Sequence, residues 1–192
     1  KQIEQVLKLK KGERIIISDG NMQECLVEIV DANKNAVDIK ILKKYQNESE
    51  PVTTVTLYCS ILKKENFEWV VQKATEIGVA EIIPIISKRT IKLDLKREQS
   101  GRGRLPVLRS SMDFDRAVQD AKKNQVNILF DATGKDFKKA NANKVGIFIG
   151  PEGGWDGTEI IFAEKQGVTI ATLGKLTLRA ETATIIASYL VM

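Results

Sequence analysis

The chain has 192 residues, of which 43% are hydrophobic and 29% are charged, a balance typical of a globular protein with one large or two small domains. Its net charge of +5 favours a polyanionic partner. It has no histidine and only two cysteines, Cys25 and Cys59, which excludes Ser-His-Asp and Cys-His hydrolases, a zinc cluster and a disulfide framework. Both cysteines are interpreted as buried small hydrophobic residues in a reducing compartment. Because no apolar run could span a bilayer and no signal peptide is recognisable, we expect a cytoplasmic protein without a membrane partner.

Residues 1–51 form a predicted β-rich domain. Its expected elements are a short helix over Lys1–Leu9 and strands over Arg14–Ser18, Cys25–Val30 and Ala36–Leu42. Turn-forming Asp, Asn and Gly residues separate the strands. The polar run Tyr45–Glu50, closed by Pro51, predicts a linker. The motif content of this domain is weak, so an RNA-binding module and a purely structural β-cap remain alternatives.

Residues 52–192 read as an α/β domain. Thr53–Ser60 and Glu81–Ile86 are predicted strands, and apolar residues at helical spacing between Phe67 and Ile77 predict an amphipathic helix that ends at Gly78. This pattern is a βαβ unit, which implies parallel strands. Farther along the chain, Asp113–Lys123 is a predicted helix and Asn127–Asp131 a predicted strand.

The most informative stretch runs from Val145 to Val191. Two predicted strands, Val145–Ile149 and Thr169–Leu173, each run directly into a glycine-containing loop. The helix between them begins at Asp156 or Thr158, has Ile160, Ile161 and Ala163 on its buried side, and ends at Gly167. A last helix is expected over Glu181–Val191. In open α/β sheets ligands bind at the carboxyl ends of strands, so the two loops predict a ligand site.

A strongly basic segment, Ser87–Arg109, precedes this stretch. It holds eight basic and two acidic residues, a net charge of +6, which exceeds the net charge of the whole chain. Basic runs are often only solvated surfaces. Because this segment adjoins the candidate ligand edge, a phosphate-binding surface is the better interpretation.

The motif Gly150-Pro151-Glu152-Gly153-Gly154, followed by Leu173–Ala183 with its LRAETA sequence, resembles the C-terminal signature of the RsmE-type enzymes of the SPOUT methyltransferases. The resemblance implies a trefoil-knotted methyltransferase domain with a parallel sheet over residues 52–192, preceded by a PUA-like β-barrel domain over 1–51. It also implies methylation of N3 of a uridine in 16S ribosomal RNA of the small subunit, with S-adenosylmethionine as cofactor, no metal and a homodimer. In the family a substantial helix leads into the Glu-Gln-Ser-Gly-Arg motif, whereas here Glu98–Arg102 directly follows Leu93–Arg97.

The resemblance and the loop chemistry together give candidate site residues. The two loops are expected to hold the cofactor with Ile149, Gly150, Pro151, Glu152, Gly153, Gly154, Leu173, Gly174, Leu176 and Leu178. Arg179 is the candidate cation that stabilises a uracil anion, and Glu152 and Glu181 are alternative proton acceptors. RNA is expected to contact Arg89, Gln99, Ser100, Arg102 and Arg104.

Three other functions have weaker support in the sequence. Methylation of a different RNA base by the same fold would use the same loops. A non-catalytic RNA-binding protein would need only the basic segment and the β-rich domain, which leaves the paired glycine loops unexplained. A nucleotide-dependent dehydrogenase would need Gly-x-Gly-x-x-Gly, and the chain has Gly-Pro-Glu-Gly-Gly instead.

Overall fold

The computed structural model describes residues 10–19, 23–32, 36–46, 50–90 and 106–192. The chain divides into two compact units, the first ending at Glu50 and the second beginning at Pro51. This division falls one residue from the boundary that the sequence suggests. The predicted helix Lys1–Leu9 and the Glu98–Arg102 motif lie outside the described residues.

The first unit is a three-stranded antiparallel sheet in the order β1-β2-β3. Its strands are β1 (Arg14–Ser18), β2 (Gln23–Ala32) and β3 (Val37–Gln46). The register pairs Ile15 with Val27 and Val27 with Ile41, so apolar side chains of all three strands meet on one face of the sheet. β3 includes the first two residues of the predicted linker because Tyr45 pairs with Glu24. Closure of this sheet into a barrel stays a prediction.

The second unit contains a parallel sheet in the order β10-β8-β9-β4-β5-β6, with β7 also paired to β5. Its strands are β4 (Thr54–Ser60), β5 (Glu81–Ile86), β6 (Val107–Leu108), β7 (Met112–Asp113), β8 (Val126–Asp136), β9 (Lys144–Ile149) and β10 (Thr169–Thr172). The predicted α/β class with a parallel sheet is therefore confirmed. The knot stays a prediction.

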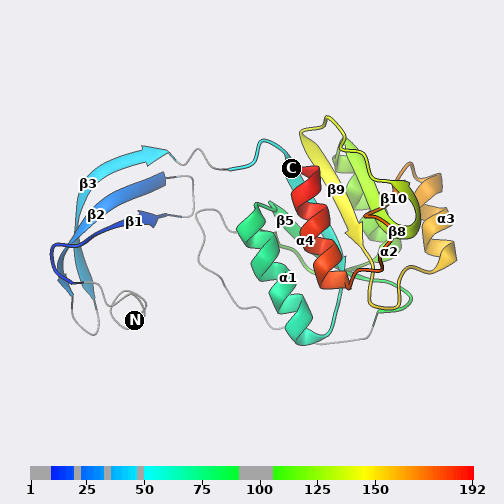
Figure 1. Ribbon diagram of the computed structural model, residues 1–192, viewed down its shortest axis with the longest axis horizontal. Coiled ribbons are helices and arrows are strands. Elements are labelled where there is room, and N and C mark those ends of the chain that lie inside the picture. Colours follow the sequence, from blue (N-terminus) through cyan, green and yellow to red (C-terminus); the bar gives the residue numbers. More distant parts are fainter. Residues whose placement is uncertain (1–9, 20–22, 33–35, 47–49, 91–105) are drawn as a thin grey trace. The chain divides into compact units, whose positions relative to one another are not determined.

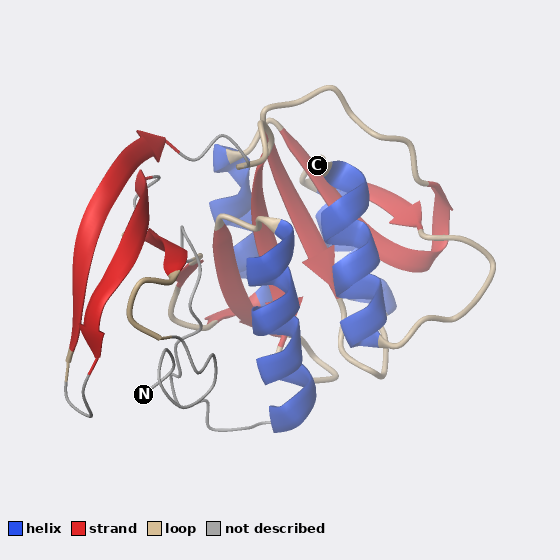
Figure 2. Ribbon diagram, turned by 60° about the vertical axis from the view of Figure 1, so that its left-hand side comes forward, coloured by secondary structure: helices blue, strands red, loops and turns tan. Residues whose placement is uncertain are grey.

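Helices cover both faces of this sheet. They are α1 (Lys64–Ile77), α2 (Phe114–Asp120), which continues as a 3-10 turn through Lys123, α3 (Gly157–Lys165) and α4 (Ala180–Val191). α1 and α4 pack side by side on one face (Figures 1 and 2). α2 and α3 contribute to the core on the opposite face. The unit is thus a three-layer α/β/α structure.

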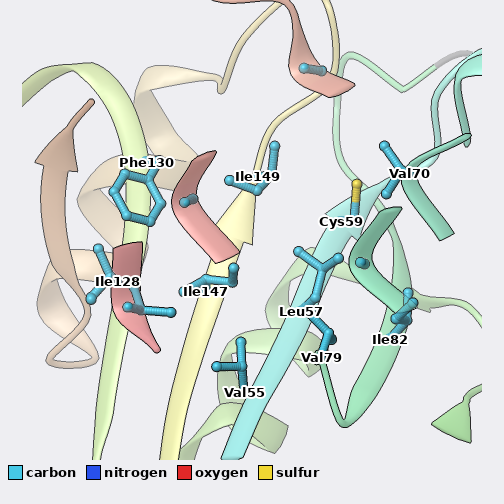
Figure 3. Packing of buried hydrophobic residues seen from close by; sticks show 14 of the residues in the cluster. Val55, Leu57, Cys59, Val70, Val79, Ile82, Ile128, Phe130, Ile147 and Ile149 are labelled. Carbon is cyan, nitrogen blue, oxygen red and sulfur yellow. The ribbon is translucent and has the colours of Figure 1, made fainter. Parts of the chain in front are cut away.

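The two cores follow from the alternation of side chains along the central strands. Leu57 and Cys59 of β4 point toward α1 and α4, and so do Ile147 and Ile149 of β9 (Figure 3). Tyr58 belongs to the opposite core, where its ring stacks on that of Phe148 with the centroids 4.5 Å apart. Cys59 is buried as expected. Cys25 is only half-buried, so the interpretation of Cys25 as a buried residue is wrong.

The ends of α1 and α3 can be compared with the capping residues that the sequence predicts. α1 ends at Gly78, whose φ of 121° terminates the helix as predicted. Asp156, and not Thr158, is the N-cap of α3, since it forms a capping box with Glu159. Ile161 was expected on the buried side but is 53% exposed, because Glu159 and Ala163, four residues apart, occupy the inward positions.

β8 is longer than predicted and irregular. Ile170 of β10 pairs with Leu129, whereas the next residue, Ala171, pairs with Lys135, so five residues of β8 bulge out of the register. Gly134 ends this bulge, and a Cβ there would lie 2.5 Å from the backbone carbon of Ala171. Only glycine permits so close an approach. The bulge places Phe130–Ala132 at the carboxyl edge of the sheet.

Candidate active site

The carboxyl ends of β8, β9 and β10 surround a cavity of about 920 Å³. Three segments form most of its wall: the β8 bulge, the Ile149–Trp155 loop and the Thr172–Glu181 segment. Lys63 and Asn66, at the start of α1, complete it. This is the edge at which α/β sheets bind ligands, as the sequence predicts.

The Gly150–Gly154 loop is held in one conformation by hydrogen bonds. Gly154 N donates to Pro151 O at 2.8 Å, which closes a tight turn, and Gly154 has a φ of +69° that favours glycine. Trp155, only 4% exposed, donates from Nε1 to Phe130 O at 3.1 Å and so ties the loop to β8. The three glycines of the loop therefore present backbone to the cavity, beside Pro151 and Glu152.

The second loop leads from β10 to α4. Gly174, with a φ of +127°, turns the chain away from β10. The chain then passes Leu176, which is 82% exposed, and reaches Arg179, the N-cap of α4. Because the N-terminus of α4 is part of the cavity wall, Arg179 and Glu181 both border the cavity.

The charged side chains of the cavity are not neutralised by one another. Arg179 forms no ion pair with Glu152 or Glu181, although the structure describes all three residues. Oε2 of Glu181 is buried and accepts no hydrogen bond from any described residue. A buried carboxylate oxygen without a partner is costly, so a ligand donor at this position would be strongly favoured.

Cys59 of β4 does not line the cavity and is not suited to act as a nucleophile. Its Sγ is 3.9 Å from Oγ1 of Thr184 in α4, and the side chain is fully buried. Burial, together with the nearby charge of Glu152, raises the pKa of the Cys59 thiol to about 12. The thiol is therefore protonated at neutral pH.

All ten residues that the sequence proposes for the cofactor line this one cavity, and so do Arg179, Glu152 and Glu181. The structure thus brings these candidates together, and their roles stay predictions. Residues that are not among the sequence-based candidates also line the cavity, including Asn66, Phe130, Asp131, Ala132 and Trp155. Asp131 could have been found, since it ends a predicted strand beside the strand that leads into the Gly150 loop. Asn66 carries no such local signal, because α1 joins the cavity only through tertiary packing.

The expected RNA contacts are only partly described. Gln99, Ser100, Arg102 and Arg104 lie outside the described residues. Arg89 is described, and its Nη1 donates to Gly153 O at 2.9 Å. Among the described residues, no cluster of three or more His, Cys, Asp or Glu side chains could hold a metal ion. No described helix is long and apolar enough to cross a membrane.

Comparison with known proteins agrees with this architecture. A family model for an RNA methyltransferase domain matches residues 48–192, and a model for an RNA methyltransferase PUA domain matches residues 5–42. The fold and the site together thus define an RNA methyltransferase.

Proteins of similar sequence identify one family within the RNA methyltransferases. Ribosomal RNA small subunit methyltransferase E of Mesomycoplasma hyopneumoniae is 35% identical over 178 residues, covering 83% of this chain and 77% of the relative. The Rickettsia conorii protein of the same name is 27% identical over 207 residues, with 96% and 82% covered. The chain belongs to the ribosomal RNA small subunit methyltransferase E family.

Two solved structures are similar over nearly the whole chain. A methyltransferase from Legionella pneumophila in complex with the cofactor SAM has a TM-score of 0.86 at 28% identity, with 99% of this chain and 86% of that chain covered. Ribosomal RNA small subunit methyltransferase E from Neisseria gonorrhoeae, bound to S-adenosylmethionine, has a TM-score of 0.85 at 27% identity, with 97% and 85% covered.

Proposed function

We propose that the protein transfers a methyl group from S-adenosylmethionine to N3 of a uridine in 16S ribosomal RNA of the small subunit. One observation carries this proposal: the two glycine loops, which α3 and β10 separate in the sequence, line one cavity whose wall also holds Arg179 and the unpartnered Oε2 of Glu181. The similar Neisseria gonorrhoeae enzyme was solved with S-adenosylmethionine bound, which supports the choice of cofactor.

The residues present fit this cofactor. Three glycines in the Gly150–Gly154 turn leave backbone groups uncovered by side chains, and Leu173, Leu176 and Leu178 supply apolar surface for a purine ring. When bound, S-adenosylmethionine supplies an electrophilic methyl group and leaves as a thioether, chemistry that needs no metal. The protein must therefore hold the acceptor nitrogen in line with the bond between sulfur and the methyl group, and it must accept the proton that N3 loses.

Glu181 is the proposed proton acceptor. Uracil N3 carries a proton that must leave before the nitrogen can attack, and a carboxylate within hydrogen-bond distance can take it. Oε2 of Glu181 is buried in the cavity wall and has no described donor, so the N3–H group would satisfy it. Glu152 is exposed in its turn, where water competes for its oxygens. These positions favour Glu181 over Glu152.

Arg179 is proposed to stabilise the uracil anion. Loss of the N3 proton spreads negative charge over O2 and O4 of the base, and a guanidinium group binds such oxygens with a planar pair of donors. Arg179 is free for this role because it pairs with neither Glu152 nor Glu181.

The RNA surface and the assembly are proposed from sequence and exposure. Gln99, Ser100, Arg102 and Arg104 would hold the RNA backbone together with the N-terminal PUA-like unit. Trp69, Tyr189 and Leu190 are exposed by 42%, 73% and 41% on the adjacent helices α1 and α4, which suits a homodimer contact. A protein that modifies ribosomal RNA would act in the cytoplasm.

Calorimetric titration tests the cofactor assignment. S-adenosylmethionine should bind with one site per chain in the presence of EDTA, and NAD should not bind. Binding of NAD in place of S-adenosylmethionine would favour a dehydrogenase, and absence of both would favour a non-catalytic RNA-binding protein.

A further inference from the structure

The turn after β5 is attached to the start of α3, although the two are far apart in sequence. Lys88 N donates to Oε1 of Glu159 at 2.9 Å, and Lys88 Nζ lies 3.5 Å from Oδ1 of Asp156. Arg89 Nη1 donates to Gly153 O at 2.9 Å, while its Nη2 lies 3.8 Å from Oδ2 of Asp156. We call this set of five residues, Lys88, Arg89, Gly153, Asp156 and Glu159, the β5–α3 contact.

Glu159 anchors the backbone of this contact. The residue is only 4% exposed, and its two carboxylate oxygens accept from two backbone N–H groups, those of Asp156 and Lys88, each at 2.9 Å. Charge-assisted hydrogen bonds to a buried carboxylate are strong, so they fix the position of residue 88 relative to α3. Arg89, the next residue, is thereby held beside the Gly150–Gly154 loop.

The Gly153 carbonyl is where Arg89 acts on this loop. Gly153 and Gly154 are consecutive glycines, and such a pair has many accessible backbone conformations. The turn hydrogen bond from Gly154 N to Pro151 O restrains one side of the pair. The bond from Arg89 restrains the other, since it fixes the direction of the Gly153 carbonyl. A Cβ on Gly153 would lie 3.5 Å from Cβ of Arg89, so the two residues are in close contact.

We propose that Arg89 is a positioning residue for the cofactor: its guanidinium selects the conformation of Gly153-Gly154 that binds S-adenosylmethionine. This inference rests on the proposed function. Arg89 is not among the described residues that line the cavity, so it acts through the loop and not on the cofactor itself. The assignment differs from the sequence-based expectation that Arg89 contacts RNA phosphate.

The expected effect follows from conformational selection. When only a fraction of the molecules has the competent loop, the apparent dissociation constant rises by the inverse of that fraction. Arg89 is half-exposed, with 50% of its side chain accessible, so the contact is partly screened by water. We therefore expect Arg89→Ala to weaken S-adenosylmethionine binding roughly three- to tenfold. Turnover at saturating cofactor should stay within about twofold of the wild type, since the bound state is unchanged.

The test compares Arg89→Ala and Arg89→Lys with a matched control, Arg116→Ala. Arg116 is 82% exposed and pairs at 3.3 Å with Asp113, the N-cap of α2. Both residues are distant in sequence from the Gly150–Gly154 loop. The measurements are the S-adenosylmethionine dissociation constant by calorimetry, kcat and KM, the melting temperature without cofactor, and the salt dependence of RNA binding. Lys can keep the charge beside Asp156 but has no planar pair of donors, so Arg89→Lys should recover only part of the affinity.

The inference is supported if Arg89→Ala weakens cofactor binding while kcat, the melting temperature and the salt slope of RNA binding match those of the control. It is overturned if cofactor affinity is unchanged and the salt slope falls by about one phosphate contact, because Arg89 would then bind RNA. An equal loss of kcat and affinity together with a lower melting temperature would also overturn it. Failure of the wild type to bind S-adenosylmethionine would instead contradict the proposed function.

Discussion

The proposed chemistry depends on two residues in the first turn of α4. Arg179 is its N-cap and Glu181 lies two residues later, so a cation and a carboxylate that do not pair with each other border the same cavity. The side chain of Arg179 makes no capping hydrogen bond, and Glu181 lies where α4 meets the cavity wall. This spacing separates the two charges and leaves both for a substrate.

Replacing Arg179 separates chemistry from binding. Arg179→Lys keeps the charge but loses the planar guanidinium, so turnover should fall by roughly ten- to a thousandfold, as for the loss of other oxyanion donors. The affinity for S-adenosylmethionine should change little. Raising the pH should restore part of the activity, because ionisation of uracil in solution replaces what the arginine supplies. Initial rates and calorimetry across pH test this.

If Arg179 only shaped the loop, the variant would lose cofactor affinity and melting temperature together, and high pH would not restore activity. That pattern would end the catalytic assignment of Arg179.

At the element scale, the β8 bulge decides the shape of the cavity. It places Phe130–Ala132 in the wall, and it depends on Gly134, which packs directly against the backbone of Ala171. Gly134→Ala should destabilise the protein by roughly 2–4 kcal/mol, since a methyl group at that distance forces the two strands apart. Chemical denaturation measures the free energy of unfolding.

Gly157→Ala is the matched control for this substitution. Gly157 is the first residue of α3, and a Cβ there meets no atom within 4 Å. Alanine should therefore leave stability unchanged or raise it by up to about 1 kcal/mol. Equal stabilities of the two variants would show that the bulge does not need glycine.

Local signals in the sequence predict most elements but not their irregularities. β1 and β5 have the predicted bounds, and the helix ends at Gly78 and Asp156 follow from capping chemistry. The two glycine loops were likewise predictable, because each follows a buried strand. The bulge of β8 could not be predicted, since it depends on pairing with β10, about 40 residues away. Asn66 could not be predicted either, because it reaches the cavity only through the packing of α1 against distant parts of the chain.

At the scale of the whole molecule, a polar network lies at the amino end of the sheet, away from the cavity. Tyr58 donates to Oδ2 of Asp120 at 2.7 Å, and Lys123 bridges Asp120 and Glu81 at 2.8 and 2.7 Å. Burial alone would raise the pKa values of both carboxyl groups. Hydrogen bonds and charge from Lys123, a hydrogen bond from Arg109 to Glu81 and from Tyr58 to Asp120, and the charge of Arg109 together outweigh burial and lower them. Burial and the bond to Asp120 raise the pKa of Tyr58.

This network predicts a loss of stability in acid. A carboxyl group whose pKa is lower in the folded state stabilises the fold above its unfolded pKa, near 4, and loses this contribution as the pH falls through the folded value. Lys123→Gln should cost about 1 kcal/mol at pH 7, because Lys123 is 39% exposed and partly screened. The difference from the wild type should shrink as the pH falls below about 4 and then through the lowered pKa values of the folded state, where both carboxyl groups become protonated. Denaturation curves at several pH values measure it.

Lys73→Gln is the control for this experiment. Lys73 pairs with Glu76 at 2.8 Å on the surface of α1, and such pairs contribute little. Its loss should change stability by less than about 0.5 kcal/mol at either pH. A difference for Lys123→Gln that does not depend on pH would contradict the electrostatic account of the network.

The exposed surface of α1 and α4 predicts the oligomeric state. Tyr189 is 73% exposed beside Leu190, and burying this surface in a partner would remove both side chains from water. Tyr189→Glu would place a charge in the interface and should convert a homodimer into a monomer. Light scattering at micromolar concentration tests this, and a monomeric wild type would contradict the dimer proposal.

The proposed product is N3-methyluridine in small-subunit ribosomal RNA, and mass spectrometry of the modified nucleosides detects it. Small subunits from a strain that lacks the enzyme, incubated with the protein and S-adenosylmethionine, should gain about one N3-methyluridine per 16S RNA. The Glu181→Gln variant should transfer at least about tenfold more slowly, as expected for loss of a general base. Methyl transfer to another base, or to no base while S-adenosylmethionine binds, would contradict the account.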